Sequence, residues 1–411
     1  MRLILQGVFL GAFAAPAAAH AQPAPVGSFQ EAVQAAWDHA PEHQAIEGRR
    51  GEATARAGAA RAFFPNAPFA TGTYVNDQVG SGQRYITYQA QVGTPLWLPG
   101  EGTATEKVAR ADLNRVDADF SSAHLSLAVI VLDLALQATT ATLSTDIAHH
   151  RLLAAQSLAA SLAQGLRAGE ATRSDLQAAQ ADAETAEASL ADAQAQRLRA
   201  QTAFTVLTGM EAVPRIMGHA TIGMSAPVVV AEQLVENHPR VVAAQRSVEA
   251  ALAAQHLTRI AERDSPEVTV IGVHEKQGFA TPYNTRFGVE LRIPFATQAR
   301  NAPRLALARS TLMNAESNLL LARRQTAIEV RQAEIDLAAT HLSAAASARA
   351  AIQLQRRRVQ IERAWRLGEM PLIEVVRART ADFDAQLVRD RTRVLSGAAE
   401  VRLSLAEGHL P

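Results

Sequence analysis

The sequence predicts a mainly α-helical fold with a small β part. Two long antiparallel α-helical hairpins are expected, together with four strands per chain that contribute to a β-barrel shared between chains. Three observations lead to this prediction: the chain repeats itself once, each repeat holds a very long run without Gly or Pro, and each repeat holds short segments in which polar and apolar residues alternate.

The composition excludes several classes of protein. The 411 residues include 40 Lys+Arg and 40 Asp+Glu, so the net charge of zero gives no reason to expect nucleic acid as a partner. Cys is absent, which excludes disulfides, thiolate metal ligands and Cys nucleophiles. We find no G-x-S-x-G, HExxH or phosphate-binding Gly motif, and we expect no enzyme, no catalytic residue and no cofactor.

Residues 1–21 have the pattern of a cleaved export signal. Arg2 precedes an apolar run over residues 3–13, and residues 17–21 end in the small side chains that signal peptidase prefers. No later stretch offers about 18 uncharged apolar residues, so we expect no transmembrane helix. Without an N-terminal Cys the mature chain is not expected to be lipidated. An exported chain of this kind is periplasmic, secreted, or inserted in an outer membrane as a β-barrel.

A constant offset relates the two halves of the remaining chain. Pro41 and Pro239 are 198 residues apart, and Gly169 and Gly368 are 199 residues apart. Other pairs at these spacings are Pro68 with Pro266, Pro95 with Pro294, Ala109-Arg110 with Ala308-Arg309, and Gly209 with Gly408. We therefore expect repeat 1 over residues 22–209, a linker over 210–229 and repeat 2 over 230–411.

Each repeat is expected to pass through the same elements. In repeat 1 they are a helix over about 29–62, a β-hairpin at 68–97, a long helix containing 103–164, a tip turn near 169 and a return helix over about 171–208. In repeat 2 they are a helix over about 231–262, a β-hairpin at 266–295, a long helix containing 304–367, a tip turn near 368 and a return helix over about 371–406. Each long helix would span roughly 90 Å, a length that favours tubes and coiled coils.

The return helix of repeat 1 carries a heptad seam in which Ala side chains let two helix axes approach closely. The seam consists of Leu176, Ala179, Ala183, Ala186, Leu190, Ala193, Ala200, Phe204 and Leu207. In repeat 2, Asp382 and Arg389 fall on the seam and interrupt it. The seam alone fits any antiparallel coiled coil.

The hairpins show the alternation of strands with one apolar face. The barrel-strand residues that we expect are Tyr85, Tyr88, Phe287, Val289 and Leu291. Aromatic residues are concentrated in the hairpins, as they are at the interfaces of barrels that face lipid. A small soluble sheet with a buried aromatic core is the alternative, and the export signal and the long helices favour the membrane barrel.

Four strands are too few to close a barrel. Unpaired strand edges are not tolerated in lipid, and about eight strands is the practical minimum. The barrel is therefore expected to be shared, with two chains giving eight strands or three chains giving twelve.

Together these features resemble the TolC-type outer-membrane efflux family over about 29–409. The family's local pattern is an aromatic or apolar residue, then Gly, then an acid six residues on, followed by apolar and Ala residues. It occurs here twice, as Leu166, Gly169, Asp175, Leu176 and Ala178, and as Trp365, Gly368, Glu374, Val375 and Ala378.

The resemblance implies a homotrimer with a twelve-strand barrel among outer-membrane lipid and a periplasmic α-barrel. It implies that the two tip turns narrow the tunnel and contact a periplasmic adaptor (membrane fusion) protein, which joins the channel to an inner-membrane efflux transporter. The expected tip residues are Leu166, Arg167, Gly169, Asp175, Trp365, Arg366, Gly368, Glu374 and Arg377. Arg377 stands where the family pattern has its next acid. Alternatively, Asp175 and Glu374 are acids favoured at helix starts by the dipole.

A finer resemblance is to the heavy-metal (Czc-type) branch of the family. It rests on residues 64–69 (Phe-Pro-Asn-Ala-Pro-Phe), 96–100 (Leu-Trp-Leu-Pro-Gly) and 299–301 (Ala-Arg-Asn). It implies divalent metal cations as the exported substrate. Export of organic toxicants or of a type I secreted polypeptide is the alternative, and a periplasmic adaptor or a structural coiled-coil protein is a more remote one.

The sequence offers no convincing site for a bound metal. His39 and His43 are four residues apart, but Pro41 lies between them at a helix break and no third ligand is apparent. His149 and His150 point to different helix faces, and no acid completes a site. We therefore expect no metal ligand, which leaves metal export open because a channel need not bind its cargo.

Overall fold

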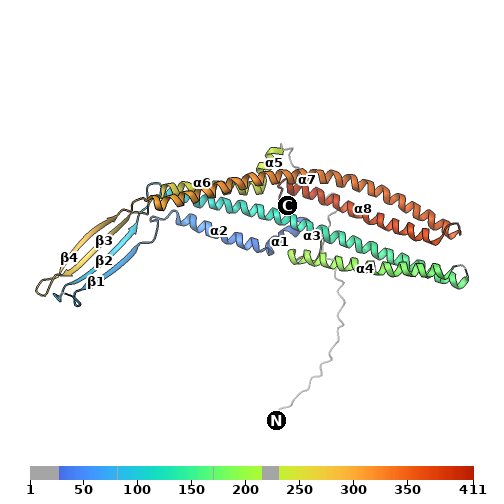
Figure 1. Ribbon diagram of the computed structural model, residues 1–411, viewed down its shortest axis with the longest axis horizontal. Coiled ribbons are helices and arrows are strands. Elements are labelled where there is room, and N and C mark those ends of the chain that lie inside the picture. Colours follow the sequence, from blue (N-terminus) through green and yellow to red (C-terminus); the bar gives the residue numbers. More distant parts are fainter. Residues whose placement is uncertain (1–26, 81, 170, 215–230) are drawn as a thin grey trace, which may run out of the picture.

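The computed structural model shows an elongated molecule with strands at one end and helical turns at the other (Figure 1). It describes residues 27–80, 82–169, 171–214 and 231–411. The expected export signal over 1–21, and residues 215–229 of the expected linker, lie outside the described residues. The helices are α1 (Phe29–His39), α2 (Pro41–Ala59), α3 (Glu101–Ala168), α4 (Arg173–Thr208), α5 (Ala231–Asn237), α6 (Pro239–Ile260), α7 (Gln298–Arg366) and α8 (Leu372–Ala406). The strands are β1 (Phe69–Asn76), β2 (Ile86–Pro95), β3 (Glu267–Lys276) and β4 (Asn284–Arg292).

The first helix of each repeat is interrupted: the break expected at Pro41 is confirmed, and the range 231–262, for which no break was expected, also contains two helices. Pro41 begins α2 and Pro239 begins α6. Proline has no N–H to continue the hydrogen-bond ladder and pushes the preceding residue out of the helical region. Accordingly, Ala40 and His238 have extended backbones with ψ of 129° and 133°.

The two long helices exceed the expected lengths slightly. The 68 residues of α3 and the 69 residues of α7 each correspond to roughly 100 Å of helix. Each packs along its return helix, α4 or α8. The heptad seam predicted for α4 is confirmed at its centre, where Ala179, Ala186 and Leu190 are buried.

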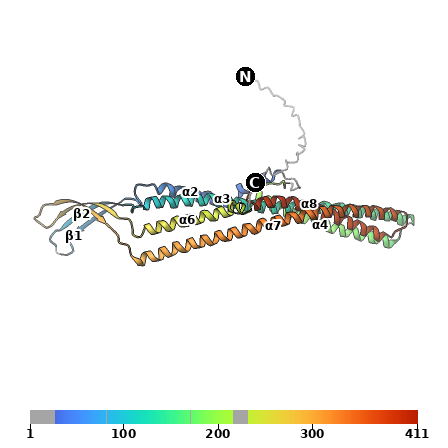
Figure 2. The same ribbon diagram turned by 90° about the horizontal axis from the view of Figure 1, so that it is seen from above.

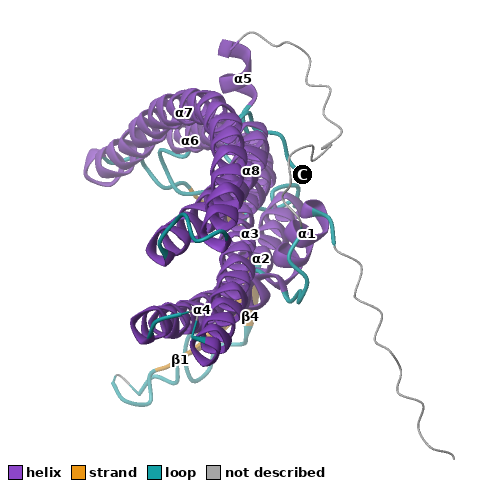
Figure 3. Cartoon of the chain, turned by 90° about the vertical axis from the view of Figure 1, so that its right-hand side faces the viewer, coloured by secondary structure: helices purple, strands orange, loops and turns teal. Residues whose placement is uncertain are grey.

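The helices form a narrow layer that curves when viewed along its length (Figures 2 and 3). Contacts run in the order α2, α3, α6, α7 near the strands and α4, α3, α8, α7 near the turns. In the middle of the molecule α1 covers the convex side and contributes Ala32, Val33 and Trp37 to the largest buried cluster. This arrangement leaves the concave side of the layer open.

One stretch of α3 is long and apolar enough to cross a membrane by length and composition, with a mean hydropathy of 1.6. The sequence pattern predicted no transmembrane helix. Within α3, Ala128, Val131 and Leu132 are fully buried in the central cluster against α1 and α8. Packing inside the helical layer therefore explains part of the apolar character of α3, because 33% of this apolar stretch is buried.

The strands form one antiparallel sheet in the order β1-β2-β3-β4. The central pair is in register with Tyr88 opposite His274, and the outer pairs place Tyr74 opposite Tyr88 and Thr285 opposite His274. The fold class predicted from the sequence, long helices with a small four-strand part, is confirmed.

Candidate functional site

The two faces of the sheet differ sharply in chemistry. Tyr88, Phe287, Val289 and Leu291 lie on one face, as predicted, and 49–82% of each residue's surface is exposed. The same apolar face carries Ala70, Gly72, Tyr74, Ile86, Ala90, Val92, Val268, Val270, Gly272, His274 and Thr285. A sheet face with so much exposed apolar surface is suited to lipid and is unusual in water.

The opposite face is mainly polar, although it also carries Phe69, Val75, Ile271 and Val273, and two of its acids pair with Arg side chains. Glu275 is buried and accepts a hydrogen bond from Arg286, while Glu267 forms an ion pair with Arg292 at 3.4 Å. The same polar face carries Thr71, Thr73, Thr87, Gln89, Gln91, Thr269 and Glu290. Alternating lipid-facing and water-facing residues of this kind are typical of a transmembrane barrel strand.

Tyr85 does not belong to a strand, so this one strand assignment is wrong. The strand β2 begins at Ile86, one residue later. The preceding Arg84 has φ of 60°, in the left-handed region, which interrupts the extended backbone. The Asp77 carboxylate accepts a hydrogen bond from the Tyr85 N–H at 2.9 Å and so ties Tyr85 to the loop.

Both edges of the sheet are open in the described chain. Each of the edge strands, β1 and β4, pairs with one neighbour only. The same edge that carries β4 continues into α7, where Leu321, Ile328, Ile335 and Leu342 recur every seven residues and are 55–75% exposed. In the described chain, a free strand edge therefore continues into an exposed apolar helix stripe, and surfaces of both kinds are suited to pairing with another chain.

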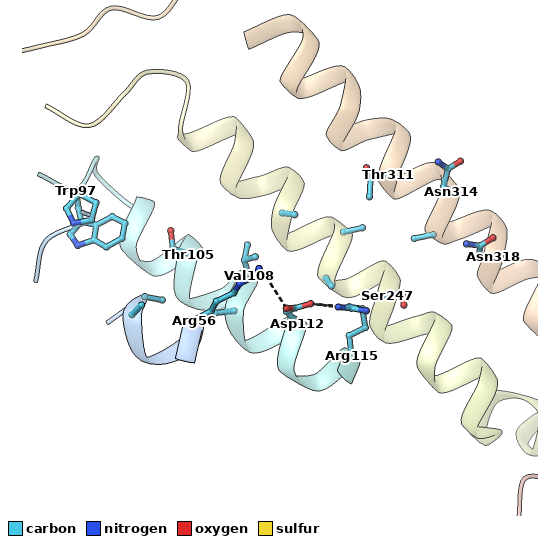
Figure 4. Close-up of a pocket in the computed structure, with 18 residues that line it drawn as sticks. Arg56, Trp97, Thr105, Val108, Asp112, Arg115, Ser247, Thr311, Asn314 and Asn318 are labelled. Atoms are coloured by element: carbon cyan, nitrogen blue, oxygen red, sulfur yellow. Dashed lines mark hydrogen bonds and ion pairs between the residues drawn. The ribbon is translucent and has the colours of Figure 1, made fainter. Parts of the chain in front are cut away.

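The concave side of the layer near the strands holds a hollow of about 710 Å³ (Figure 4). Its lining comes from all four helices of the layer, α2, α3, α6 and α7, and consists largely of Ala with polar side chains between. Asp112 lies between two guanidinium groups, with Arg115 at 2.7 Å and Arg56 at 3.7 Å. Asn314 and Asn318 of α7 line the same hollow. The hollow thus places one carboxylate and two guanidinium groups among mainly small apolar side chains.

The two predicted tip turns lie together at the end of the molecule farthest from the sheet (Figure 1). At the first turn, Gly169 has φ of 77°, and its N–H donates to the carbonyl of Leu166 at 3.2 Å. Thr172 caps α4 by accepting from the Asp175 N–H, and its hydroxyl donates to the Asp175 carboxylate. Arg167 points back along α3 and donates to the carbonyl of Ala163.

At the second turn, Gly368 has φ of 79°, which a side chain would strain. Pro371 precedes α8, and Glu374 in its first turn forms an ion pair with Arg377 at 2.8 Å. The acid that the sequence singled out is therefore locally neutralised by Arg377. Arg366 ends α7, one residue before the turn.

The two hairpins contact each other near the tips. Leu372 of α8 is buried with Leu158 and Leu162 of α3, and the Trp365 side chain packs against this cluster. The structure thus brings Trp365 and the first residues of α8 against repeat 1, whereas the Gly169 and Gly368 turns have open space beside them.

A polar network that sequence reasoning did not identify lies behind the second tip. Arg358 of α7 donates to Asp382 of α8 at 2.8 Å and to Glu362 at 3.1 Å. Arg379 of α8 donates to Glu362 at 2.7 Å, and its other end donates to the backbone carbonyl of Ala154 in α3. The network therefore links three helices of two hairpins.

Burial and charge act in opposite directions on Glu362. Burial alone would raise its pKa, but the hydrogen bonds and charges of Arg379 and Arg358 together outweigh burial and lower it. Glu362 thus stays ionised between its two partners. The signal in the sequence was the Asp382 interruption of the seam, since a buried carboxylate at a seam position requires a buried cation nearby.

The predicted absence of a metal site has no contrary finding in the part of the chain that the structure describes. There, no group of three or more His, Asp or Glu residues is placed to hold a metal ion. The His39 ring N–H donates to the carbonyl of Ala35 at 2.7 Å, and His43 packs against Trp37 at 5.2 Å between ring centroids. Both side chains therefore make contacts that stabilise the fold.

Several solved structures with this fold are described as outer membrane proteins or membrane channels. CusC, described as forming a transmembrane channel, has a TM-score of 0.77 and 17% identity over 93% of this chain and 92% of its own. VceC, an outer membrane protein from Vibrio cholerae, has a TM-score of 0.71 and 18% identity over 92% of this chain and 96% of its own. The outer membrane channel CmeC from Campylobacter jejuni has a TM-score of 0.74 and 13% identity over 93% of this chain and 85% of its own.

The sequence also matches a family directly. Residues 32–210 match the model of the family described as outer membrane efflux protein. None of the curated proteins compared with the chain matches it. Residues 32–210 thus resemble the outer membrane efflux protein family, and the described chain has the fold of these channel proteins, which confirms the predicted resemblance.

Proposed function

We propose that the protein is the outer-membrane exit duct of a tripartite efflux pump. It conducts substrate passively from an adaptor and an inner-membrane transporter to the exterior and carries out no chemical reaction itself. The observation that carries this proposal is a sheet with one exposed apolar face, joined directly to helical hairpins roughly 100 Å long. Such a molecule reaches from a membrane far into the adjoining compartment.

The open edges support a homotrimer. Unpaired backbone groups at a strand edge cost several kcal/mol each in lipid, so β1 and β4 require partners there. Three copies of the four-strand sheet give a twelve-strand barrel, and the apolar stripe of α7 then packs against a neighbouring copy. The apolar sheet face contacts outer-membrane lipid, and the helices extend into the periplasm.

The tips support contact with a partner protein. Leu367 and Ile373 flank the second turn and are 69% and 51% exposed. Exposed apolar residues at a turn favour docking, and we assign this surface, with Leu166, Gly169 and Gly368, to the periplasmic adaptor. Threefold symmetry would bring the tips around one axis and form the constriction there.

For the substrate, we favour divalent heavy-metal cations over organic toxicants or a secreted polypeptide. The support comes from residues 64–69, 96–100 and 299–301, which resemble the heavy-metal branch. The hollow at Asp112 combines one carboxylate with two guanidinium groups, so it gives no support to metal cations over the other substrates.

The proposal is tested by growth of a deletion strain on divalent metals and on organic toxicants in one series. Selective sensitivity to zinc, cobalt, cadmium or copper that the wild-type gene reverses supports the metal duct. Sensitivity only to dyes, detergents or antibiotics supports the duct with organic cargo. Normal growth on both, with the purified protein failing to conduct ions in a planar bilayer, would contradict an exit duct.

A further inference from the structure

Two loops form the end of the sheet that lies farthest from the helices, which we call the rim. It is formed by the loops that join β1 to β2 and β3 to β4, at the end of the molecule opposite the helical tips (Figure 1). Arg84 in the first loop is the one non-Gly residue with positive φ among the described residues, at 60°. A left-handed backbone at a long side chain is strained and persists only where its surroundings hold it.

Asp77 holds the strained residue from both sides. Its carboxylate accepts hydrogen bonds from the N–H groups of Gln83 at 2.7 Å and Tyr85 at 2.9 Å, the two neighbours of Arg84. The Asp77 N–H also donates to the Tyr85 carbonyl at 3.3 Å. The loop therefore presents the Arg84 side chain in a fixed position.

Two cations at the rim lie over aromatic rings. The Arg84 guanidinium is 4.8 Å from the centre of the Phe279 ring in the second loop, and the Lys276 ammonium is 5.8 Å from the centre of the Tyr283 ring. A ring face holds a cation without using its N–H donors. Both side chains are thus placed while their donors stay available to an anion.

An aromatic band lies directly below these cations on the apolar face. Tyr74 is 5.1 Å from Tyr88, Tyr88 is 6.4 Å from His274, and His274 stacks on Tyr283 at 4.6 Å between ring centroids. The band extends across all four strands or their ends. Lys276 also lies on the apolar face, because it is opposite Ile86 of that face. Amphipathic rings of this kind sit at the level of lipid headgroups.

The cations of the polar face and the cations of the rim differ in their ion pairing. On the polar face, Arg286 and Arg292 each have a carboxylate partner. Within the part of the chain that the structure describes, no carboxylate forms an ion pair with Arg84 or Lys276. The rim cations therefore lack the neutralising partner that the other strand cations have, and they stand where headgroup phosphates would lie.

We infer that Arg84 and Lys276 bind the phosphate groups of a lipid in the outer leaflet, while the aromatic band below contacts its acyl chains. The inference rests on the proposed function because it places the sheet in the outer membrane. Free phosphate would engage the cations only, whereas the lipid also covers the exposed rings of Tyr74 and Tyr88. The site thus selects a phosphorylated lipid.

The test uses the full-length protein, extracted from outer membranes and freed of lipid in a non-ionic detergent. Native mass spectrometry counts bound lipid A that carries two phosphates, and bound lipid A with both phosphates removed. We expect the wild type to prefer the phosphorylated form by about tenfold or more, since each cation near a headgroup contributes measurably. The Arg84→Gly/Lys276→Gln variant should lose this preference.

Two features keep the test decisive. Gly accepts positive φ without strain, so Arg84→Gly should fold at least as well as the wild type. The control, Lys107→Gln/Arg110→Gln, removes the same charge from exposed positions on α3 and should keep the preference. An unchanged preference in the rim variant, or its loss when 10 mM inorganic phosphate is added to the wild type, would overturn the lipid site. Absence from outer membranes would instead contradict the proposed function.

Discussion

The Arg379 guanidinium donates a hydrogen bond at 3.1 Å to the backbone carbonyl of Ala154, a residue 225 positions away in the sequence. This bond joins the return helix of the second hairpin to the long helix of the first. The other end of the same guanidinium is held by Glu362 at 2.7 Å. One side chain therefore connects the two hairpins just behind the tips.

Replacing Arg379 by Gln should weaken this connection. The variant loses the bond to Ala154 and leaves Glu362, whose side chain is only 13% exposed, with Arg358 alone. Removing one partner of a half-buried charge pair costs about 1–3 kcal/mol, and the loss should appear in urea unfolding. The control is Arg331→Gln, whose ion pair with Glu334 is exposed and should be worth less than about 1 kcal/mol. Equal losses in the two variants would show that Arg379 has no special position.

The ionised Glu362 side chain should make the folding stability sensitive to acid. Its folded-state pKa is lowered from the ordinary value of 4.5, so below that pH the unfolded chain binds a proton that the folded chain does not. The stabilisation is fully present above pH 4.5 and is lost as pH falls through the folded pKa. The stability difference between wild type and Glu362→Gln should therefore shrink as the pH is lowered below 4.5. A difference that stays constant with pH would contradict the ionised network.

The buried His238 ring should give the folding stability a second pH dependence, at higher pH than that of Glu362. Burial, with Arg240 nearby, lowers its pKa from 6.5 to about 4, and its Nδ1 accepts a hydrogen bond from the Arg240 N–H. The neutral ring contributes its full stabilisation above pH 6.5, and the contribution falls by about 3 kcal/mol as the pH drops to about 4. His238→Asn keeps an acceptor at the start of α6 but does not titrate. The pH dependence between 6.5 and 4 should be smaller in this variant, as followed by thermal unfolding.

The second tip turn should be sensitive to its backbone. Gly368 has φ of 79°, which proline cannot adopt, so Gly368→Pro would distort the turn. Glu374→Arg would replace the ion pair with Arg377 by two neighbouring cations. We expect either variant to lower efflux and adaptor cross-linking while trimer abundance is kept. The control is Gly48→Ala in α2, where no atom lies within 4 Å of an added methyl group. Full efflux by both tip variants at normal abundance would contradict the tip assignment.

The sequence predicted the elements better than their connections. Alternation placed Tyr88, Phe287 and Val289 on one face because the period of a strand is fixed by backbone geometry. The break between α1 and α2 falls at Pro41, where the sequence predicted a helix break.

The network behind the tips was beyond sequence reasoning for a different reason. Asp382 was visible as an interruption of the seam, but its partner Arg358 is on another helix, and Arg379 reaches a backbone carbonyl that has no side-chain signature. Likewise, the left-handed Arg84 follows from the Asp77 hydrogen bonds, which depend on how the loop closes. Contacts of this kind require the folded chain.

The central claim is that further copies of the chain close its open sheet into one barrel, and an interchain disulfide tests this most directly. In the β2–β3 pair, Gln91 lies opposite Ile271. Glu290 of β4 corresponds to Gln91 in the repeat, and Thr73 of β1 corresponds to Ile271. Glu290 of one copy should therefore lie opposite Thr73 of a neighbouring copy. The chain has no Cys, so Thr73→Cys/Glu290→Cys introduces the only thiols.

Oxidised outer membranes of this variant should give a covalent trimer on a non-reducing gel. The control, Thr73→Cys/Arg286→Cys, shifts one thiol by four residues, or about 13 Å along the strand, beyond the reach of a disulfide. We expect trimers for the first pair and monomers for the control. Monomers for both pairs, in protein that is correctly located in the outer membrane, would contradict the shared barrel.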